Sequence, residues 1–179
     1  MKKYFDELTS AMNWLSGKDE TIFIGQAVEY PGTAMFNSLK TVDDSKKIEL
    51  PVFEDTQMGI SLGLALNGYK VISIYPRWNF LLCATNQLVN HVDKFPLIAS
   101  DNKKNNIIIR TAVGSMRPLH PGFQHIGNYT DAYRKMLDTV EVIEVKEVNQ
   151  IMPAYLKAYE REDGISTLIV EYMDFYNEK

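Results

Sequence analysis

The alternation of apolar and polar positions is clearest over residues 47–75, where it predicts a strand, a helix and a second strand. The first apolar run, residues 48–53, is followed at once by an acid, Glu54. We expect a helix to begin directly after it, because Asp55 is a common type of capping residue. The second strand is predicted over residues 70–75. A strand–helix–strand unit of this kind closes right-handed into a parallel sheet.

The same alternation continues along the rest of the chain. Apolar residues at helical spacing predict helices over residues 4–15, 33–39, 78–95, 130–137 and 148–160. Short apolar runs predict strands over residues 21–25, 106–113, 140–145 and 166–172. Strands that alternate with helices, with no repeat and no linker, predict a single α/β domain over residues 1–179. We expect a mainly parallel sheet of about six strands with helices on both faces.

Composition and charge exclude several classes of protein. A net charge of −4 gives no electrostatic footprint for nucleic acid, and no apolar run approaches the roughly 18 residues needed to cross a bilayer. The N-terminal segment carries acids and lacks a small-residue cleavage site, so it does not resemble a signal peptide. The single cysteine, Cys83, lies in an apolar stretch and is expected to be packed. We therefore expect a cytoplasmic protein that binds neither nucleic acid nor membrane.

The common nucleotide-binding motifs are absent, and no hydrolase nucleophile elbow is expected. The chain has neither a GxGxxG nor a GxxxxGK[ST] sequence after a strand. Its GISLG sequence lies within the predicted helix, where glycines four residues apart usually indicate close backbone packing, and not at the strand-to-helix turn that a nucleophile elbow needs. Its histidines lack partners at metal-ligand spacing, so no metal site is expected in this chain. Glu54, by contrast, follows a predicted strand, and open α/β sheets bind ligands at the carboxyl ends of their strands. Position alone leaves two interpretations of Glu54: a charge that caps the helix, or a group that does chemistry.

Two further features are expected at the same edge of the sheet. The turn at residues 75–80 is rich in aromatic residues. Residues 114–129 form a long loop with several glycines and prolines that holds His120 and His125, and loops of this length are usually functional or mobile. An acid, an aromatic surface and an imidazole suit a planar nitrogen heterocycle better than a sugar or a phosphate. The alternative is that the aromatic residues belong to the core and that His125 lies on the surface.

At these residues the sequence resembles a known family. The stretch LPVFEDTQMGISLGLALNGYKVISIYPRWNFLLCATNQLVNHVDK is similar to the pyrimidine-binding domain of thiamine-diphosphate enzymes. The nearest type is the beta subunit of the decarboxylating components of 2-oxoacid dehydrogenases, and transketolase is a more distant relative. The residues that match the family pattern are Glu54, Gly59, Gly63, Gly68, Asn79, Phe80, Gln87, Asn90 and Lys94. The likeness continues through GQAVEYPG upstream and IIIRTAVG, FQHIG and STLIVEYM downstream, and so covers nearly the whole chain.

The resemblance implies a role for each candidate residue. Glu54 would hydrogen-bond N1′ of the aminopyrimidine of thiamine diphosphate, and so help the cofactor to lose its C2 proton. Phe80 would stack on the pyrimidine ring. His125 would contact the substrate or the acyl acceptor. The other cofactor-binding positions that the resemblance implies would shape the pocket; they are Val52, Tyr75, Pro76 and Trp78.

The resemblance also implies partners. The family holds the diphosphate and Mg²⁺ on a domain with a GDG-type motif, which this chain lacks. We therefore expect a separate alpha-type, diphosphate-binding subunit that holds the Mg²⁺. We expect a homodimer formed through the glycine-bearing helix and residues 87–94, and a heterotetramer with the partner. The chain stops at Lys179, before the C-terminal domain that beta subunits of the family carry, which favours a free-standing split enzyme over a large dehydrogenase complex.

Three functions stay open at this point. The first is decarboxylation of a small 2-oxo acid or transfer of its acyl fragment. The second is a transketolase-like ketol transfer or a carboligation, with a ketose as substrate. The third is a non-catalytic domain with a structural or regulatory role. Arg77 in the aromatic turn and the SMRPLHPG segment are further departures from the family, and they would either recognise an anionic substrate or be solvated loop charges.

Overall fold

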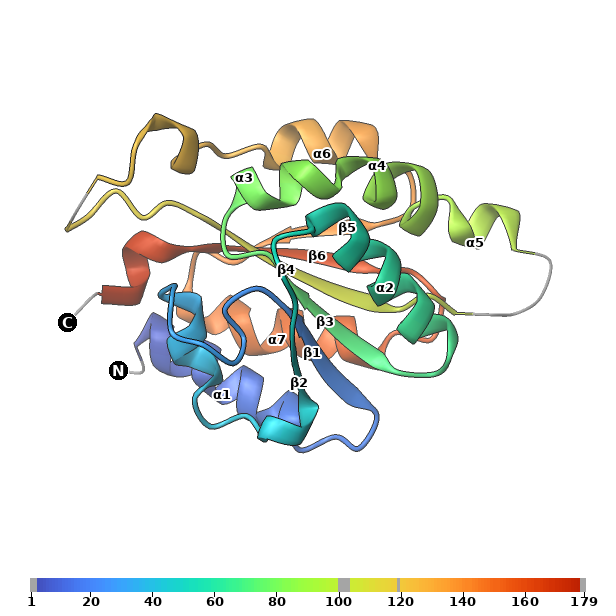
Figure 1. The fold of residues 1–179 in the computed structure, drawn as a ribbon, viewed down its shortest axis with the longest axis horizontal. Coiled ribbons are helices and arrows are strands. Elements are labelled where there is room, and N and C mark those ends of the chain that lie inside the picture. Colours follow the sequence, from blue (N-terminus) through green and yellow to red (C-terminus); the bar gives the residue numbers. More distant parts are fainter. Residues whose placement is uncertain (1–2, 100–103, 119, 178–179) are drawn as a thin grey trace.

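The computed structural model describes residues 3–99, 104–118 and 120–177. In this part of the chain all strands run parallel in one sheet, in the order β2-β1-β3-β4-β6-β5 (Figure 1). The strands are β1 (Thr21–Gly25), β2 (Lys47–Glu49), β3 (Lys70–Ile74), β4 (Ile107–Val113), β5 (Glu141–Glu144) and β6 (Thr167–Tyr172). The predicted α/β class and parallel sheet are confirmed. All strands except β2 begin and end within one residue of the predicted positions.

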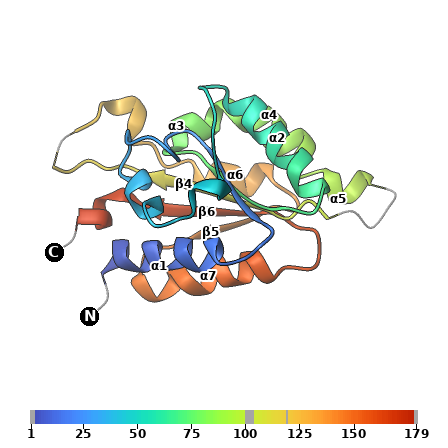
Figure 2. The same cartoon turned by 60° about the horizontal axis from the view of Figure 1, so that its bottom comes forward.

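Helices cover both faces of this sheet, as predicted. The layer on one face consists of α1 (Tyr4–Ser16) and α7 (Val148–Glu160), which pack side by side (Figure 2). The layer on the other face consists of α2 (Glu54–Leu66), α3 (Trp78–Leu81), α4 (Thr85–Gln87) and α6 (Thr130–Met136). The remaining short turns of helix are Met35–Leu39, Asp44–Lys46, Leu82–Ala84, Leu88–Val92, α5 (Phe95–Ile98), Phe123–His125 and Met173–Asn177.

Two apolar layers arise because successive residues of a strand point to opposite faces. In β3, Ile72 and Ile74 pack into the layer that α1 and α7 cover. Val71 in the same strand and Tyr75 directly after it pack into the layer under α2 and α3. A sheet that is buried on both faces needs near-continuous apolar strands, which is the pattern that the sequence has.

The connection between β2 and α2 differs from the prediction. A strand over residues 48–53 followed by a helix from Asp55 was expected, but β2 ends at Glu49 and α2 already begins at Glu54. The reason is Pro51. The backbone N–H of Leu50 still donates to the carbonyl oxygen of Gly25 in the neighbouring strand, and Pro51 has no N–H with which to continue that ladder. The connection is therefore a loop, and its residues Val52 and Phe53 are exposed.

The predicted helix over residues 78–95 is also not continuous. It is divided into α3, a 3₁₀ turn, α4 and a π-helical turn at Leu88–Val92, followed by α5. The π turn is closed by a hydrogen bond from the N–H of Asp93 to the carbonyl oxygen of Leu88. The Asp93 carboxylate in turn accepts hydrogen bonds from the backbone N–H groups of residues 138–140. These distant bonds fix the position of Asp93 and so override the local helical period.

A buried ion pair joins the neighbouring strands β4 and β6 on the face of the sheet that α1 and α7 cover. Arg110 of β4 donates from Nε and Nη2 to the Glu171 carboxylate of β6 at 2.6 and 3.0 Å. Burial alone would lower the pKa of Arg110, but the facing Glu171 carboxylate outweighs it and raises that pKa. Tyr155 of α7 and Tyr176 near the C-terminus also donate to Glu171. The pair therefore joins β4, β6, α7 and the C-terminal segment.

Candidate functional site

Glu54 is the first residue of α2, at the carboxyl edge of the sheet. It is only 7% exposed. The N-cap position before it is Phe53, whose side chain makes no capping hydrogen bond. Over the residues that the structure describes, this carboxylate has no hydrogen bond and no ion pair. Burying an unpaired carboxylate is costly, and the helix N-terminus offsets only part of that cost. Glu54 is therefore a candidate for contact with a ligand.

Tyr75 follows β3 and reaches the first turn of α2. Its hydroxyl donates to the backbone carbonyl oxygen of Glu54 at 3.2 Å. Burial raises the pKa of the Tyr75 hydroxyl, and the nearby charges of Glu54 and Asp55 raise it further. The phenol therefore stays neutral and keeps its proton as a donor. This hydrogen bond fixes the start of α2 against the end of β3.

The packing of α2 on the sheet is close at the end of β1. Gln57 of α2 donates from Nε2 to the carbonyl oxygen of Ile74 at 2.9 Å and to Ser73 Oγ at 3.2 Å. A Cβ atom on Gly25 would lie 2.4 Å from the same carbonyl oxygen of Ile74 and 3.2 Å from Gln57 Nε2. Only glycine fits there, so the strand end and the helix start are held in one arrangement.

His125 lies against the aromatic turn. Its Nδ1 is 3.1 Å from Oδ1 of Asn79, and its ring centroid is 6.3 Å from that of Phe80, with 33° between the ring planes. Both side chains are half-buried. The predicted meeting of the aromatic turn and the histidine loop at this edge therefore occurs through Asn79 and Phe80.

Arg77 connects the same turn to the start of the histidine loop. Its Nε donates to the carbonyl oxygen of Gly114 at 2.9 Å, directly after β4. The side chain is half-buried, and burial lowers the pKa of its guanidinium from the ordinary value. The turn at residues 77–80 thus contacts the loop at Gly114 and again at His125.

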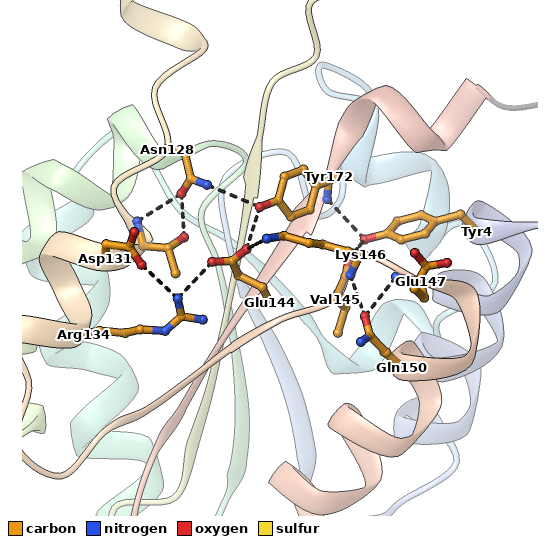
Figure 3. A network of polar contacts seen from close by, with 11 residues as sticks. Tyr4, Asn128, Asp131, Arg134, Glu144, Val145, Lys146, Glu147, Gln150 and Tyr172 are labelled. Carbon is orange, nitrogen blue, oxygen red and sulfur yellow. Dashed lines mark hydrogen bonds and ion pairs between the residues drawn. The ribbon is translucent and has the colours of Figure 1, made fainter.

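Other carboxylates anchor the two ends of the loop. At its start, Asp174 Oδ1 accepts the backbone N–H groups of Met116 and Arg117 at 2.8 and 3.2 Å. At its end, Asn128 donates to the hydroxyl of Tyr172 at 3.3 Å, and Tyr172 donates to Glu144 at 2.7 Å (Figure 3). The loop is therefore tied to the carboxyl ends of β5 and β6.

The network in Figure 3 continues from Glu144 to two cations. Lys146 lies 2.6 Å from one carboxylate oxygen, and Arg134 lies 3.1 Å from the other. Burial pushes the pKa of Glu144 upward, but the hydrogen bonds from Lys146 and Tyr172 outweigh it and hold the pKa below its usual range. Glu144 is therefore an ionised anchor for the end of the loop.

The predicted site residues fall into three groups. Tyr75, Pro76 and Trp78 lie in the interior, and Trp78 packs on the Tyr133 ring with centroids 4.9 Å apart. Phe80 and His125 are half-buried and lie together. Val52 is 69% exposed on the loop that precedes Glu54. Their roles toward a cofactor stay predictions.

Cys83 differs from its prediction. It was expected to be packed, but its side chain is exposed. The division of the helix into short turns places it on the outer side, where its thiol donates to the carbonyl oxygen of Asn79 at 3.7 Å.

Several residues that shape the site carry no signal in the local sequence pattern. Asp174 and Glu144 act on the loop from positions about 58 and 16 residues away, so their roles follow only from the tertiary fold. Glu49 likewise accepts the backbone N–H groups of residues 27–29 at 2.7 to 2.9 Å, and so holds the loop that follows β1.

The described ranges offer neither a metal site nor a membrane-spanning helix. Residues 3–99, 104–118 and 120–177 contain no group of three or more His, Cys, Asp or Glu side chains that could hold a metal ion. The helices within these ranges are all too short or too polar to cross a membrane.

The fold and the comparisons with known proteins agree: the chain has a transketolase-like α/β fold and is similar in sequence to a dehydrogenase beta subunit. One curated relative to which the chain is similar is the pyruvate dehydrogenase E1 component subunit beta of Gracilaria tenuistipitata var. liui, 26% identical over 144 residues that make up 78% of this chain. One solved structure of similar fold is a split gene transketolase, an inactive beta4 tetramer, with a TM-score of 0.70, 16% sequence identity and 93% of this chain covered. No protein-family model matches the chain.

The match extends over only part of each relative. The chain spans 43% of the length of the curated relative and 50% of the chain in the solved structure. At 16% identity the structural likeness concerns the fold alone. These matches therefore assign no activity, substrate or partner to this chain.

Proposed function

We propose that this chain is the pyrimidine-binding subunit of a split thiamine-diphosphate enzyme that acts on a 2-oxo acid. The observation that carries the proposal is the Glu54 carboxylate, buried at the start of α2 with no partner among the described residues. An aminopyrimidine has a ring nitrogen that such a carboxyl group can hydrogen-bond. The half-buried Phe80 ring beside His125 supplies an aromatic surface for the same heterocycle. The residues present therefore fit the pyrimidine half of the cofactor.

Thiamine diphosphate, when bound, supplies a nucleophilic carbon and an electron sink for cleavage next to a carbonyl group. Glu54 would hold or share a proton at the pyrimidine ring nitrogen. Its position would be kept by the hydrogen bond from Tyr75 to its backbone carbonyl oxygen. Because the side chain is only 7% exposed, water would compete weakly for this contact.

His125 would contact the substrate or the acyl acceptor. An amide oxygen only accepts hydrogen bonds, so Asn79 Oδ1 accepts the hydrogen bond that the N–H group of His125 Nδ1 donates. That leaves Nε2 as the nitrogen with a free lone pair. His125 would therefore be oriented to accept a proton from a reacting group, or to donate one when it is protonated.

The diphosphate and its Mg²⁺ would be held by a separate subunit with a GDG-type motif. Two copies of this chain would pair through α2 and residues 87–94. In support of this pairing, Ile60 is 40% exposed on α2, and a Cβ atom added to Gly63 would meet no atom within 4 Å. A second helix could approach α2 closely at that point.

Ketol transfer is the second candidate function. The observation that favours it is the fold likeness to a split gene transketolase chain. The site residues named above would serve both reactions, because in each the bond next to a carbonyl carbon breaks.

Calorimetry of this chain mixed with a GDG-type partner chain tests the proposal. Thiamine diphosphate with Mg²⁺ should bind to the pair, and absence of binding would support a structural or regulatory role instead. Glu54→Gln should keep the fold, judged by circular dichroism and melting temperature, and should lower turnover by about 10²- to 10⁴-fold. Asp55→Asn is the matched control, because it removes a charge from the same helix turn. Wild-type turnover in Glu54→Gln would show the assignment to be wrong.

A further inference from the structure

Arg77 differs from three of the other arginines in having no counter-charge among the described residues. Three arginines pair with carboxylates: Arg110, Arg134 and Arg161. Arg117 is exposed in the histidine loop. Arg77 is half-buried. Among the described residues its side chain makes one hydrogen bond, to the backbone carbonyl oxygen of Gly114. No carboxylate of the described residues lies within ion-pair distance of it. A partly desolvated cation of this kind is unfavourable until an anion joins it.

The geometry of Arg77 leaves its anion-binding face free. The Gly114 carbonyl oxygen accepts a hydrogen bond from Arg77 Nε, and this contact fixes the orientation of the guanidinium plane. The four N–H groups of Nη1 and Nη2 have no partner among the described residues. Two terminal nitrogens in a fixed plane match the two oxygens of a carboxylate or a phosphate.

Arg77 also lies beside the candidate site. Asn79 follows Arg77 by two residues in the same turn, so the Cα atoms of Arg77 and Asn79 are within about 7 Å of each other. Asn79 contacts His125, and Arg77 contacts Gly114 at the other end of the same loop. The turn at residues 77–79 therefore contacts the histidine loop at two places, through the Arg77 side chain and through the Asn79 side chain.

We infer that Arg77 binds a second, non-reacting anionic group of the substrate, a carboxylate or a phosphate. The inference rests on the proposed function. A 2-oxo acid loses its own carboxylate as CO₂, and the charge leaves that group in the transition state as the C–C bond breaks. A guanidinium that held this carboxylate would stabilise the substrate more than the transition state. An anionic group that stays in place through the reaction has no such disadvantage and helps to position the substrate.

The first arm of the test uses the full chain alone. Inorganic phosphate and succinate are titrated separately while the arginine Nε–H signals are followed by nuclear magnetic resonance. A saturable shift confined to Arg77 is expected, and the anion that gives it identifies phosphate or carboxylate as the ligand group. Arg134, which is already paired with carboxylates, is the internal control. Equal shifts at all arginines, or none at Arg77, would overturn the inference.

The second arm uses the reconstituted pair of subunits with substrates that differ by one anionic group: pyruvate against 2-oxoglutarate, and a ketose against its phosphate ester. Arg77→Gln should lower kcat/KM about 10- to 100-fold for the member with the extra anion, mainly through KM. The other member should change by less than about threefold. Arg77→Lys should restore part of the loss, and Lys135→Gln, an exposed control, should change neither.

The two proposals fail in different ways. If the wild-type pair does not bind thiamine diphosphate, the proposed function fails, and the titration of the chain alone still decides the role of Arg77. If Arg77→Gln weakens cofactor binding, or slows both members of a substrate pair equally, Arg77 is a structural residue and the inference is overturned.

Discussion

His125 Nδ1 lies 3.1 Å from Oδ1 of Asn79, although 46 residues separate the two in the sequence. The contact orients the imidazole from outside its own loop. Because the amide oxygen of Asn79 cannot donate a hydrogen bond, the imidazole donates one from Nδ1. Nε2 is then the ring nitrogen that can accept a hydrogen bond or a proton. The orientation of His125 is therefore set by the aromatic turn, which also carries Phe80 and Arg77.

Asn79→Ala should impair turnover without affecting cofactor binding. The side chain of Asn79 orients His125 and would not itself contact the pyrimidine. Loss of that orientation should lower kcat about 10- to 100-fold, because small displacements of a reacting group are costly. Asn67→Ala, on an exposed amide after α2, is the control. Kinetics and calorimetry on the reconstituted pair measure both quantities, and unchanged kcat would remove His125 from the reaction.

The pattern of apolar residues predicts the fold well where local and tertiary preferences agree. The residues of α1 and α7 follow one helical period and bury one face, so both helices lie where the periodicity places them. The prediction fails at Pro51, which ends β2 early, and at Asp93, whose contacts with residues 138–140 introduce a π turn. The π turn at Asp93 depends on residues more than 40 positions away in the sequence, so a local pattern cannot predict it.

The candidate site is predictable to a similar degree. Glu54, the aromatic turn and the histidine loop are expected at one edge because parallel strands end there. The sequence does not predict which aromatic residue of the turn is buried and which remains accessible. In the structure Trp78 packs in the core and Phe80 is half-buried. The anchors Asp174 and Glu144 are typical surface acids in the sequence, and only the tertiary fold gives them their roles.

Asp174→Ala should loosen the start of the histidine loop with little effect on the whole domain. Its carboxylate accepts the N–H groups of Met116 and Arg117, and each bond contributes about 1 kcal/mol locally. Hydrogen exchange at these two amides should become faster, while exchange in β4 stays unchanged. Faster exchange throughout β4 would show that Asp174 supports the sheet itself.

The Glu144 network should make stability depend on pH. The pKa of Glu144 is held below its unfolded value by Lys146 and Tyr172, so its contribution is present above the unfolded pKa and is lost as pH falls through the folded pKa. Glu144→Gln should cost about 1–2 kcal/mol at pH 7 and flatten the loss of stability on acidification. Urea unfolding at a series of pH values measures this. Glu160→Gln, an exposed change, should leave the pH profile unchanged.

The buried pair Arg110–Glu171 should show strong coupling. Removal of one partner leaves a charge in the α1 and α7 layer without compensation, so Arg110→Met or Glu171→Gln should each cost about 3–5 kcal/mol. The double variant should lose less than the sum, because it buries no unpaired charge. Urea unfolding of the four proteins gives the coupling energy. Simple additivity would mean that the tyrosines, and not the ion pair, stabilise this layer.

Gly63→Arg should separate folding from self-association. A side chain at this position meets no atom of the chain within 4 Å, and arginine favours a helix more than glycine does by about 1 kcal/mol. The variant should therefore fold with an unchanged or slightly higher melting temperature. If α2 pairs with a second copy, a long charged side chain on its glycine face should dissociate the homodimer, seen as a halved mass in sedimentation equilibrium. Asn149→Arg adds the same charge on α7, on the opposite face of the sheet, and should leave the mass unchanged. A dimer that survives Gly63→Arg would place the contact between copies on another face.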